Sequence, residues 1–226
     1  MEERDVTAAV AGKNRALKDF GLAALRNPFV QFVARAIRFD LRPWDRIEMD
    51  RICREWVREL GPDRLDVLEI SGTSWRSFGF RSYREASYPE FDVCTQVFDD
   101  RFDLIVADQV FEHIRYPHRA ARNVRMMLRP GGYFLISVPF FVKVHAAPID
   151  CCRWTEDGLR YMLEDCGFDR TSIRTGAWGN AACGRAFMRI WWPRGWGSLR
   201  NEAEFPIVVW ALARTPGDGS SVTPSE

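Results

Sequence analysis

The stretch that decides the fold is FDLIVADQVFEHIRYPHRAARNVRMMLRPGGYFLISV, residues Phe102–Val138. It opens and closes with apolar runs, at 102–107 and 133–138, each of a length typical of a strand buried on both faces. Between them, His118–Leu128 carries apolar residues at helical spacing, and Arg129–Gly132 (Arg-Pro-Gly-Gly) is a helix stop. A buried strand, a helix and a second buried strand predict a parallel pair joined by a crossover helix.

The same alternation continues on both sides of this unit. Leu65–Ile70 and Ile207–Ala213 are further apolar runs of strand length. Thr155–Cys166 predicts a helix, with Thr155 as N-cap, two acidic residues in the first turn and Gly167 after its end. We therefore expect an α/β fold whose sheet is mostly parallel and covered on both faces.

The two ends of the chain differ from this pattern. Residues 1–60 have apolar residues at helical spacing, and Pro28 and Pro43 divide them into two or three short helices, so we expect a helical N-terminal cap. Residues 215–226 are rich in Pro, Gly and Ser, which predicts a disordered tail.

Composition excludes several classes of protein. Lysine and arginine (32) balance aspartate and glutamate (31), so no overall field attracts nucleic acid. The six cysteines form no CxxC pair and the three histidines complete no zinc motif, which favours reduced thiols in a cytoplasmic protein without a metal. The charged N-terminus lacks the apolar core of a signal peptide, and no apolar run approaches the roughly 20 residues of a membrane span.

The turn after the first strand, Val67–Trp75, is the first candidate for ligand binding. An open parallel sheet binds ligands at the carboxyl ends of its strands, and glycine allows backbone to come close to a ligand. The turn holds one glycine, Gly72, so it lacks the Gly-x-Gly-x-x-Gly pattern of dinucleotide-binding proteins. Taken alone, it is equally well a tight turn.

Three segments together resemble a known family. Phe102–His113, Met127–Ile136 and His145–Phe168 are similar, in this order, to the class I S-adenosylmethionine-dependent methyltransferases, above all the small-molecule enzymes of the ubiquinone-biosynthesis type (type 11 family). The resemblance spans roughly residues 65 to 168. It implies a Rossmann-like sheet of seven strands with the last antiparallel, S-adenosylmethionine as cofactor, and a methyltransferase domain over 61–214.

The resemblance assigns the cofactor site residue by residue. Glu69 matches the acidic residue that orders the first loop and the methionine end of the cofactor. Ser71, Gly72 and Thr73 occupy the glycine-rich turn, where the family usually has three glycines and this chain has one.

The next assignments concern the ribose and the adenine. Glu85 matches the acidic residue that accepts from the ribose hydroxyls, a task that suits a carboxylate because it can accept from two donors at once. Tyr83 or Ser87 could take over part of this role. The interval from the first strand to Glu85 is short, so a helix is missing there. Asp92 matches the aspartate that accepts from the adenine amino group, with Val93 beside the ring; a surface turn is the alternative.

Polar residues after the later strands complete the predicted site. Asp108 and Gln109 follow a buried strand, where the family lines the methionine part of the cofactor. Glu112 and His113 come next; Glu112 is expected to support the start of the following helix, and His113 is either a base or a wall of the site.

His145 is the stronger candidate for the base, because histidine exchanges a proton near neutral pH. The order His145, Pro148, Asp150, Arg153, Thr155 recurs in related methyltransferases above the acceptor pocket. Asp150 would orient the histidine or bind the acceptor. A loop-stabilising network without chemistry is the alternative.

The insertion at 176–205 is rich in tryptophan between Trp178 and Trp196. It is a lid over the acceptor, a subunit interface of a homodimer, or a packed turn, and the sequence does not separate these.

The function expected from these features is methyl transfer from S-adenosylmethionine to a small molecule, as O-methylation of a sugar or natural-product intermediate, with no metal, nucleic acid or membrane involved. The alternatives are a non-catalytic partner subunit that keeps the fold, and an oxidoreductase, against which the missing glycines argue. A nucleic-acid methyltransferase lacks support in the charge and in the motifs.

Overall fold

The computed structural model describes residues 27–28, 31–32, 41–146, 149–190, 193–194 and 200–217. Its strands are β1 (Asp66–Ile70), β2 (Ser82–Ala86), β3 (Phe102–Asp108), β4 (Leu128–Pro139), β5 (Arg174–Trp178) and β6 (Val208–Arg214). Its helices are α3 (Trp44–Glu59), α4 (Pro117–Met127), α5 (Glu156–Asp165) and α6 (Ala181–Arg189), with short 3-10 helices η1 (Pro62–Arg64), η2 (Phe111–His113) and η3 (Arg170–Ser172).

The strands form one sheet in the order β2-β1-β3-β4-β6-β5. The pairs β1–β2, β1–β3 and β3–β4 are parallel, whereas β6 runs antiparallel to both β4 and β5. This confirms the predicted Rossmann-like α/β fold with an antiparallel last strand.

The predicted number of strands was wrong, because the sheet formed by the described residues has six strands instead of seven. Residues 87–101, between β2 and β3, form turns. Their backbone bonds locally: the amides of Thr95 and Gln96 donate to the carbonyl oxygen of Asp92 at 3.0 and 2.9 Å. Groups that are satisfied within a turn are not available to a strand ladder.

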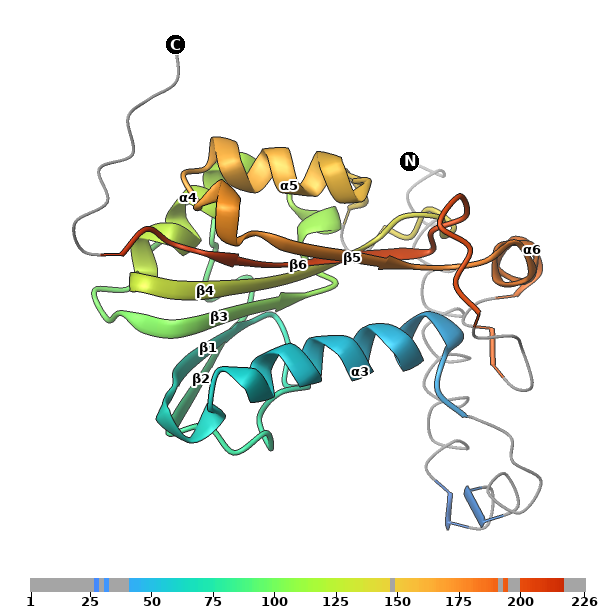
Figure 1. Cartoon of the computed structure of the whole chain (residues 1–226), viewed down its shortest axis with the longest axis horizontal. Helices are drawn as coiled ribbons and strands as arrows, with labels where there is room; N and C mark the ends of the chain where they lie inside the picture. Colours follow the sequence, from blue (N-terminus) through green and yellow to red (C-terminus); the bar gives the residue numbers. More distant parts are fainter. Residues whose placement is uncertain are drawn as a thin grey trace, which may run out of the picture.

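Helices cover both faces of the sheet (Figure 1). α3 lies on one face, and α4 and α5 lie on the other. The side chain of Thr155 caps α5 by accepting from the Gly158 amide, and Gly167 follows that helix with a φ of 88°, as the sequence predicts. Each face has its own buried apolar cluster, which fixes the helices against the sheet.

The start of β4 differs from the sequence prediction. β4 begins at Leu128, directly after α4, so Arg129–Gly132 belongs to the strand and not to a loop before it. The pairing with β3 shifts register there, and Gly131 has a φ of 73°, as in a β-bulge. The link from β1 to β2 contains no helix, as expected.

The chain ends are described only in part. Within the predicted cap 1–60, α3 is described and begins directly after Pro43; most of the rest lies outside the described residues. Thr215 is buried at the end of β6, and residues 218–226 of the predicted tail lie outside the described residues. Among the described helices, none is both long and apolar enough to cross a bilayer.

Candidate active site

The turn after β1 is built around the buried carboxylate of Glu69, which is 1% exposed. Its two oxygens accept from the backbone amides of Ser74 (2.9 Å) and Trp75 (3.0 Å) and from the hydroxyl of Tyr83 (2.6 Å). Burial and the nearby carboxylate raise the pKa of Tyr83, so its hydroxyl stays a donor. Glu69 therefore orders this turn, as the sequence predicts.

The conformation of the turn explains its single glycine. A Cβ on Gly72 would lie 2.6 Å from Oε1 of Glu69, so any other residue here would force that hydrogen-bonded carboxylate to move. Ser71 has a φ of 56°, in the left-handed region that glycine adopts most easily. Ser71 and Thr73 are exposed and therefore accessible to a ligand.

The residues predicted for the ribose and adenine are less uniform. Glu85 is exposed on β2, next to Glu69 in the parallel register, and pairs with Arg76. Asp92 lies in a turn, where its Oδ1 accepts from the Cys94 amide at 2.9 Å. Val93 is buried in the apolar cluster that also contains Phe91, and its place beside the adenine ring stays a prediction.

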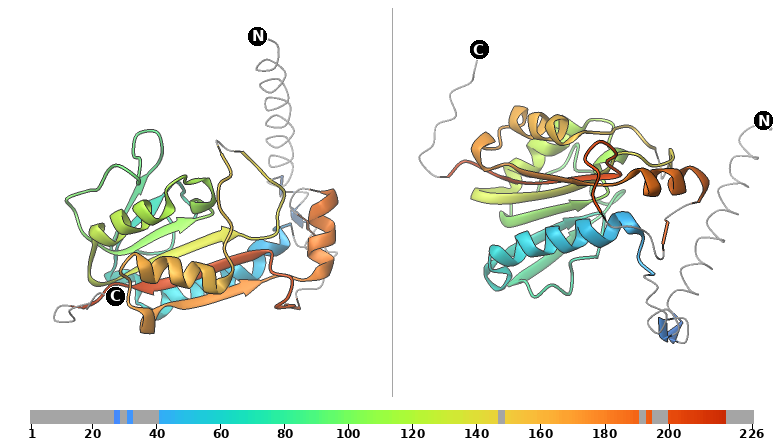
Figure 2. Two further views of the ribbon diagram at one scale, coloured as in Figure 1. Left: turned by 90° about the horizontal axis from the view of Figure 1, so that it is seen from above. Right: turned by 45° about the vertical axis from the view of Figure 1, so that its right-hand side comes forward.

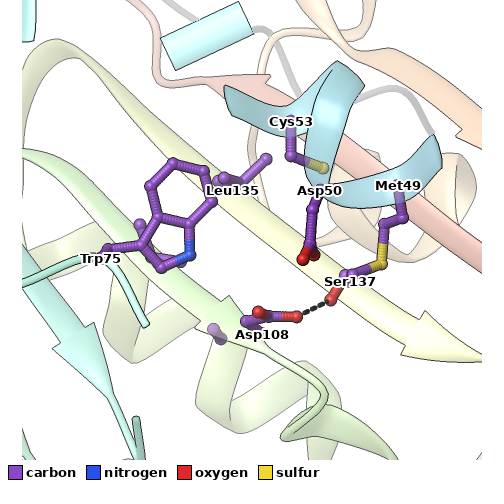
Figure 3. A pocket seen from close by; sticks show the side chains of 9 residues that line it. Met49, Asp50, Cys53, Trp75, Asp108, Leu135 and Ser137 are labelled. Carbon is purple, nitrogen blue, oxygen red and sulfur yellow. Dashed lines mark hydrogen bonds between the residues drawn. The ribbon is translucent and has the colours of Figure 1, made fainter. Parts of the chain in front are cut away.

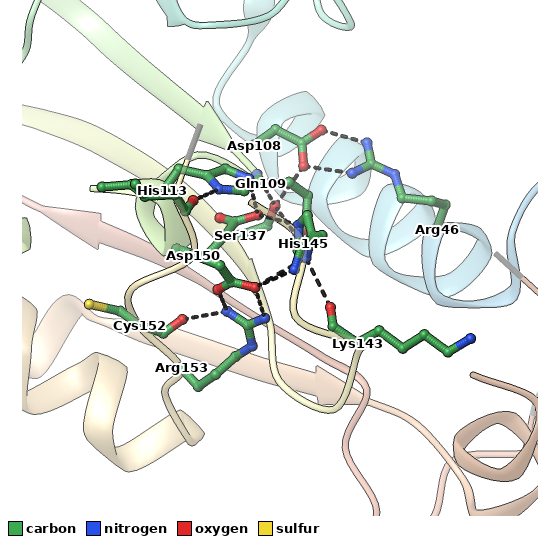
Figure 4. Close-up of polar contacts among 12 residues, drawn as sticks. Arg46, Asp108, Gln109, His113, Ser137, Lys143, His145, Asp150, Cys152 and Arg153 are labelled. Carbon is green, nitrogen blue, oxygen red and sulfur yellow. Dashed lines mark hydrogen bonds and ion pairs between the residues drawn. The ribbon is translucent and has the colours of Figure 1, made fainter. Parts of the chain in front are cut away.

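Asp108 ends β3 and is held by two partners (Figure 4). Arg46 of α3 binds it through both terminal nitrogens, at 2.9 and 2.6 Å, and the hydroxyl of Ser137 donates to it at 2.6 Å. Gln109 follows with a φ of 58°, and its side-chain amide donates to the Ser137 oxygen at 3.1 Å. Sequence analysis missed Arg46 and Ser137; a lone serine in the apolar run 133–138 was the available sign of the latter.

A small cavity lies beside Asp108, between α3 and the sheet (Figure 3). Its volume is about 10 Å³, about the space that one water molecule needs. It is lined by Met49, Asp50, Cys53, Trp75, Val106, Ala107, Asp108, Leu135 and Ser137.

The predicted catalytic residues His113 and His145 lie close together (Figure 4). Both rings also approach the buried carboxylate of Glu112. Nε2 of His113 lies 3.5 Å and Nε2 of His145 lies 4.0 Å from Oε1 of Glu112. The two rings are 5.0 Å apart and nearly perpendicular. Glu112 is 1% exposed, its Oε2 has no hydrogen-bond partner among the described residues, and burial raises its pKa to about 7.

Asp150 holds the loop that carries His145. It accepts from the backbone amide of His145 at 2.9 Å, lies 3.3 Å from Nδ1 of its ring, and forms a bidentate pair with Arg153. Burial alone would raise the pKa of Asp150, but Arg153 and the His145 amide hold it below its usual value. Burial lowers the pKa of His145. The three predicted catalytic residues are thus brought together.

This loop is also attached to η2. The backbone oxygen of Glu112 accepts from the amides of Cys151 (2.7 Å) and Cys152 (3.3 Å), and Nδ1 of His113 bonds the carbonyl oxygen of Ile149 at 2.5 Å. Figure 2 shows the loop at the end of the sheet where α6 also lies.

The expectation that Glu112 supports a helix start was wrong. Glu112 lies in η2, and the next helix, α4, begins only at Pro117, a residue well suited to a first helical position. Glu112 instead lies between the two histidines. The adjacent pair Glu112-His113 was the sign of it in the sequence, but its burial could not be read there.

The tryptophan-rich region is partly described. Trp178 ends β5 and is 3% exposed, so this part is core packing. Residues 191–192 and 195–199 lie outside the described residues, so the expected lid or interface is not tested.

A family model described as a methyltransferase domain matches residues 28–173. The chain belongs to this family. The match, which covers more than half of the chain, confirms the expected S-adenosylmethionine-dependent methyltransferase and its cofactor. It does not identify a subfamily or an acceptor.

Other comparisons add little to this assignment. No curated protein matches the chain. Solved structures with a similar fold include an S-adenosylmethionine-dependent methyltransferase from Thermotoga maritima (11% identity, TM-score 0.49, 73% of this chain and 88% of that chain). Another comes from Mesorhizobium loti (17%, 0.46, 71% and 97%). A third is phosphoethanolamine N-methyltransferase 2 of Haemonchus contortus (11%, 0.48, 74% and 52%). At such identities we draw no conclusion about substrate from them.

Proposed function

We propose that this methyltransferase transfers the methyl group of S-adenosylmethionine to a hydroxyl group of a small molecule, a sugar or natural-product intermediate. The observation that carries the proposal is the convergence of Glu112, His113, His145 and Asp150 in the loops that follow β3 and β4. The turn after β1 belongs to the same edge, because the carboxyl ends of parallel strands lie together.

The residues of this edge fit the cofactor. Ser71 and Thr73 are exposed in the turn after β1, Glu85 is exposed on the neighbouring strand β2, and Glu69 fixes the turn through the Ser74 amide. We propose that the turn contacts the cofactor through its backbone and that Glu85 accepts from the ribose hydroxyls. Asp92 remains the proposed acceptor for the adenine amino group. When bound, the cofactor supplies a methyl group on a positively charged sulfur, which an oxygen attacks directly.

The protein then has two tasks, alignment and proton removal. His145 is the proposed base, because it is the more exposed of the two histidines, at 32% of its side chain against 18% for His113. Its Nδ1 lies 3.1 Å from the carbonyl oxygen of Lys143, which can only accept, so Nδ1 carries the hydrogen and Nε2 the lone pair. Asp150 keeps this loop in place through the His145 amide.

Replacement of His145 by alanine tests this role. Turnover should fall by about a hundredfold or more, while affinity for S-adenosylmethionine stays unchanged, because the base acts on the acceptor. The assay is transfer of a labelled methyl group to a panel of hydroxylated sugars and natural products, with calorimetry for the cofactor. His118→Ala is the matched control, since His118 is half-exposed on α4 and far from the loop in sequence. Unchanged turnover of H145A would remove His145 from the mechanism.

One observation favours the second candidate, a partner subunit without catalysis. The carboxylate of Asp108, predicted to line the methionine part of the cofactor, is engaged by Arg46 and Ser137. Calorimetry separates the two functions, because absence of cofactor binding at millimolar concentration would support the partner subunit.

The remaining expectations are part of the proposal. They are the division into an N-terminal cap (1–60) and a methyltransferase domain (61–214), a homodimer or a lid involving 176–205, and a cytoplasmic location. The six cysteines are free thiols in the structure, which supports the last.

A further inference from the structure

The strongest unexplained feature is the buried carboxylate between two histidines. Glu112 is 99% enclosed, since its exposed fraction is 1%, and its Oε2 has no hydrogen-bond partner among the residues that the structure describes. Burying an ionised carboxylate without a partner costs several kcal/mol. A bound proton or a bound cation removes this cost. The two histidines beside Glu112 are the residues that bear on which of them binds.

Both histidines present the same atom to this carboxylate. Nδ1 of His113 bonds the carbonyl oxygen of Ile149, and Nδ1 of His145 lies against the carbonyl oxygen of Lys143 and the carboxylate of Asp150. Because these groups accept, each Nδ1 carries the hydrogen and each Nε2 carries a lone pair. Metal-binding histidines are commonly oriented by such a bond from the other ring nitrogen to a carbonyl or carboxylate.

The distances suit a small cation. One ligand atom each from Glu112, His113 and His145 lies within 4.8 Å of the other two. Ligands at 2.0–2.1 Å around a tetrahedral ion are about 3.3 Å apart. The separations of 3.5 and 4.0 Å from Glu112 Oε1 therefore need to shrink by about 0.2 and 0.7 Å on binding, and the separation between the two histidine nitrogens, which is at most 4.8 Å, by up to about 1.5 Å.

We propose that Glu112, His113 and His145 bind a divalent transition-metal ion, with Zn²⁺ as the best fit to two imidazoles and one carboxylate. Three protein ligands leave a further coordination position open, as in catalytic rather than structural zinc sites. The side chains of His113 and His145 are 18% and 32% exposed, so water or an oxygen of the acceptor could reach that position.

This inference departs from the sequence analysis, which expects no metal. His145 is far from the Glu112-His113 pair in the sequence, and only the loop anchored on η2 brings them together. It also changes the proposed function in one respect: an ion bound to Nε2 of His145 would use the lone pair that His145 otherwise offers to a proton, so the ion would replace His145 as the group that activates the acceptor. It would then lower the pKa of a bound hydroxyl itself.

The test measures metal binding without cofactor or acceptor, so its failure is distinct from a failure of methyl transfer. The full chain, stripped with a chelator, is titrated with Zn²⁺ by calorimetry and with Co²⁺ by visible absorption. We expect one ion per chain in the wild type. His113→Asn and His145→Asn should each weaken binding by about a hundredfold or more, and Asp150→Asn by about tenfold.

The third histidine of the chain supplies the control. His118→Asn should bind Zn²⁺ like the wild type. Zn²⁺ should also raise the Tm of the wild type and of H118N but not of H145N. Because the His145 side chain is partly exposed, we expect H145N to fold like the wild type in the absence of metal. Thiolate-to-cobalt absorption would reveal binding by cysteines instead.

The proposal is overturned if the wild type binds no Zn²⁺ at millimolar concentration. It is equally overturned if H113N and H145N bind the ion as tightly as H118N, or if Co²⁺ binds through thiolates.

Discussion

At the scale of single residues, the carboxylate of Glu69 holds the turn after β1 in place. The carboxylate receives three hydrogen bonds and occupies the space where a Cβ of residue 72 would lie. This gives a packing reason for glycine at position 72. No ligand contact is needed to account for Gly72, because the space for its side chain is already filled by Glu69.

We predict that Gly72→Ala weakens cofactor binding by at least about tenfold and lowers the free energy of unfolding by about 1–3 kcal/mol. The added Cβ would meet Glu69 Oε1 at 2.6 Å, so the carboxylate must move and its bonds to the turn weaken. Calorimetry and urea unfolding measure the two effects.

Gly184→Ala is the matched control for this substitution. Residue 184 lies in α6, and a Cβ there would make ordinary contacts of 3.5 Å with Phe141. Its stability should stay the same or rise slightly, by up to about 1 kcal/mol. Equal behaviour of the two alanine variants would contradict the role given to Gly72.

Some site residues follow from the sequence and others do not. Glu69, His145 and Asp150 could be predicted because a motif fixes both their spacing and their place after a strand. Arg46 could not, because the pattern of α3 predicts a helix but not the strand end against which it packs. Glu112 was assigned to the wrong helix. The loop that buries it, around Cys151, is distant in the sequence, so the residues next to Glu112 give no sign of its burial.

At the scale of elements, periodicity was a good guide where packing decides the structure. β1, β3, α4, α5 and β6 lie within one or two residues of their predicted bounds, because each has a face or a whole run of apolar residues. It failed at β4, where Arg129–Gly132 looks like a break but forms a bulge. Glycine and proline occur both in loops that end a helix and in β-bulges, and here the pairing with β3 makes the segment a bulge.

α3 carries an internal cost that depends on pH. Asp45 in its first turn is 8% exposed, and its Oδ1 has no hydrogen-bond partner among the described residues. Burial raises the pKa of Asp45 to about 6, from an ordinary value of 3.8, although Arg46 opposes the shift. Because the folded-state pKa lies above the unfolded value, the folded state favours the protonated form. That stabilisation is complete below about pH 4 and is lost as the pH rises through 6.

We therefore predict that Asp45→Asn, which mimics the protonated form, is more stable than the wild type at pH 7.5, by up to about 3 kcal/mol. At pH 4 the two proteins should be nearly equal. Urea unfolding at both values measures the difference. The control is Asp63→Asn in η1, where the side chain is exposed and the difference should stay small at both values. A gain for D45N that is the same at pH 4 and 7.5 would refute the assignment to titration.

At the scale of the whole molecule, an ion pair connects helix α3, which covers one face of the sheet, to the edge formed by the carboxyl ends of the parallel strands. Arg46 and Asp108 connect the N-terminal helix to the end of β3, where the predicted cofactor site and the His113–His145 loops also meet. Cofactor binding at this edge should therefore stabilise the whole chain, because a ligand that binds only the folded state shifts the unfolding equilibrium.

We predict that S-adenosylmethionine, at about a hundred times its Kd, stabilises the chain by about 2.7 kcal/mol. For a chain of this length that corresponds to a rise in Tm of roughly 5–10 °C, which differential scanning calorimetry resolves. Glu85→Gln should reduce the rise, because the neutral amide is a weaker acceptor for hydroxyl groups. NADH should leave the Tm unchanged, since the turn at Gly72 lacks the dinucleotide glycines. A rise with NADH alone would favour an oxidoreductase, and no rise with S-adenosylmethionine would leave a partner subunit as the better description.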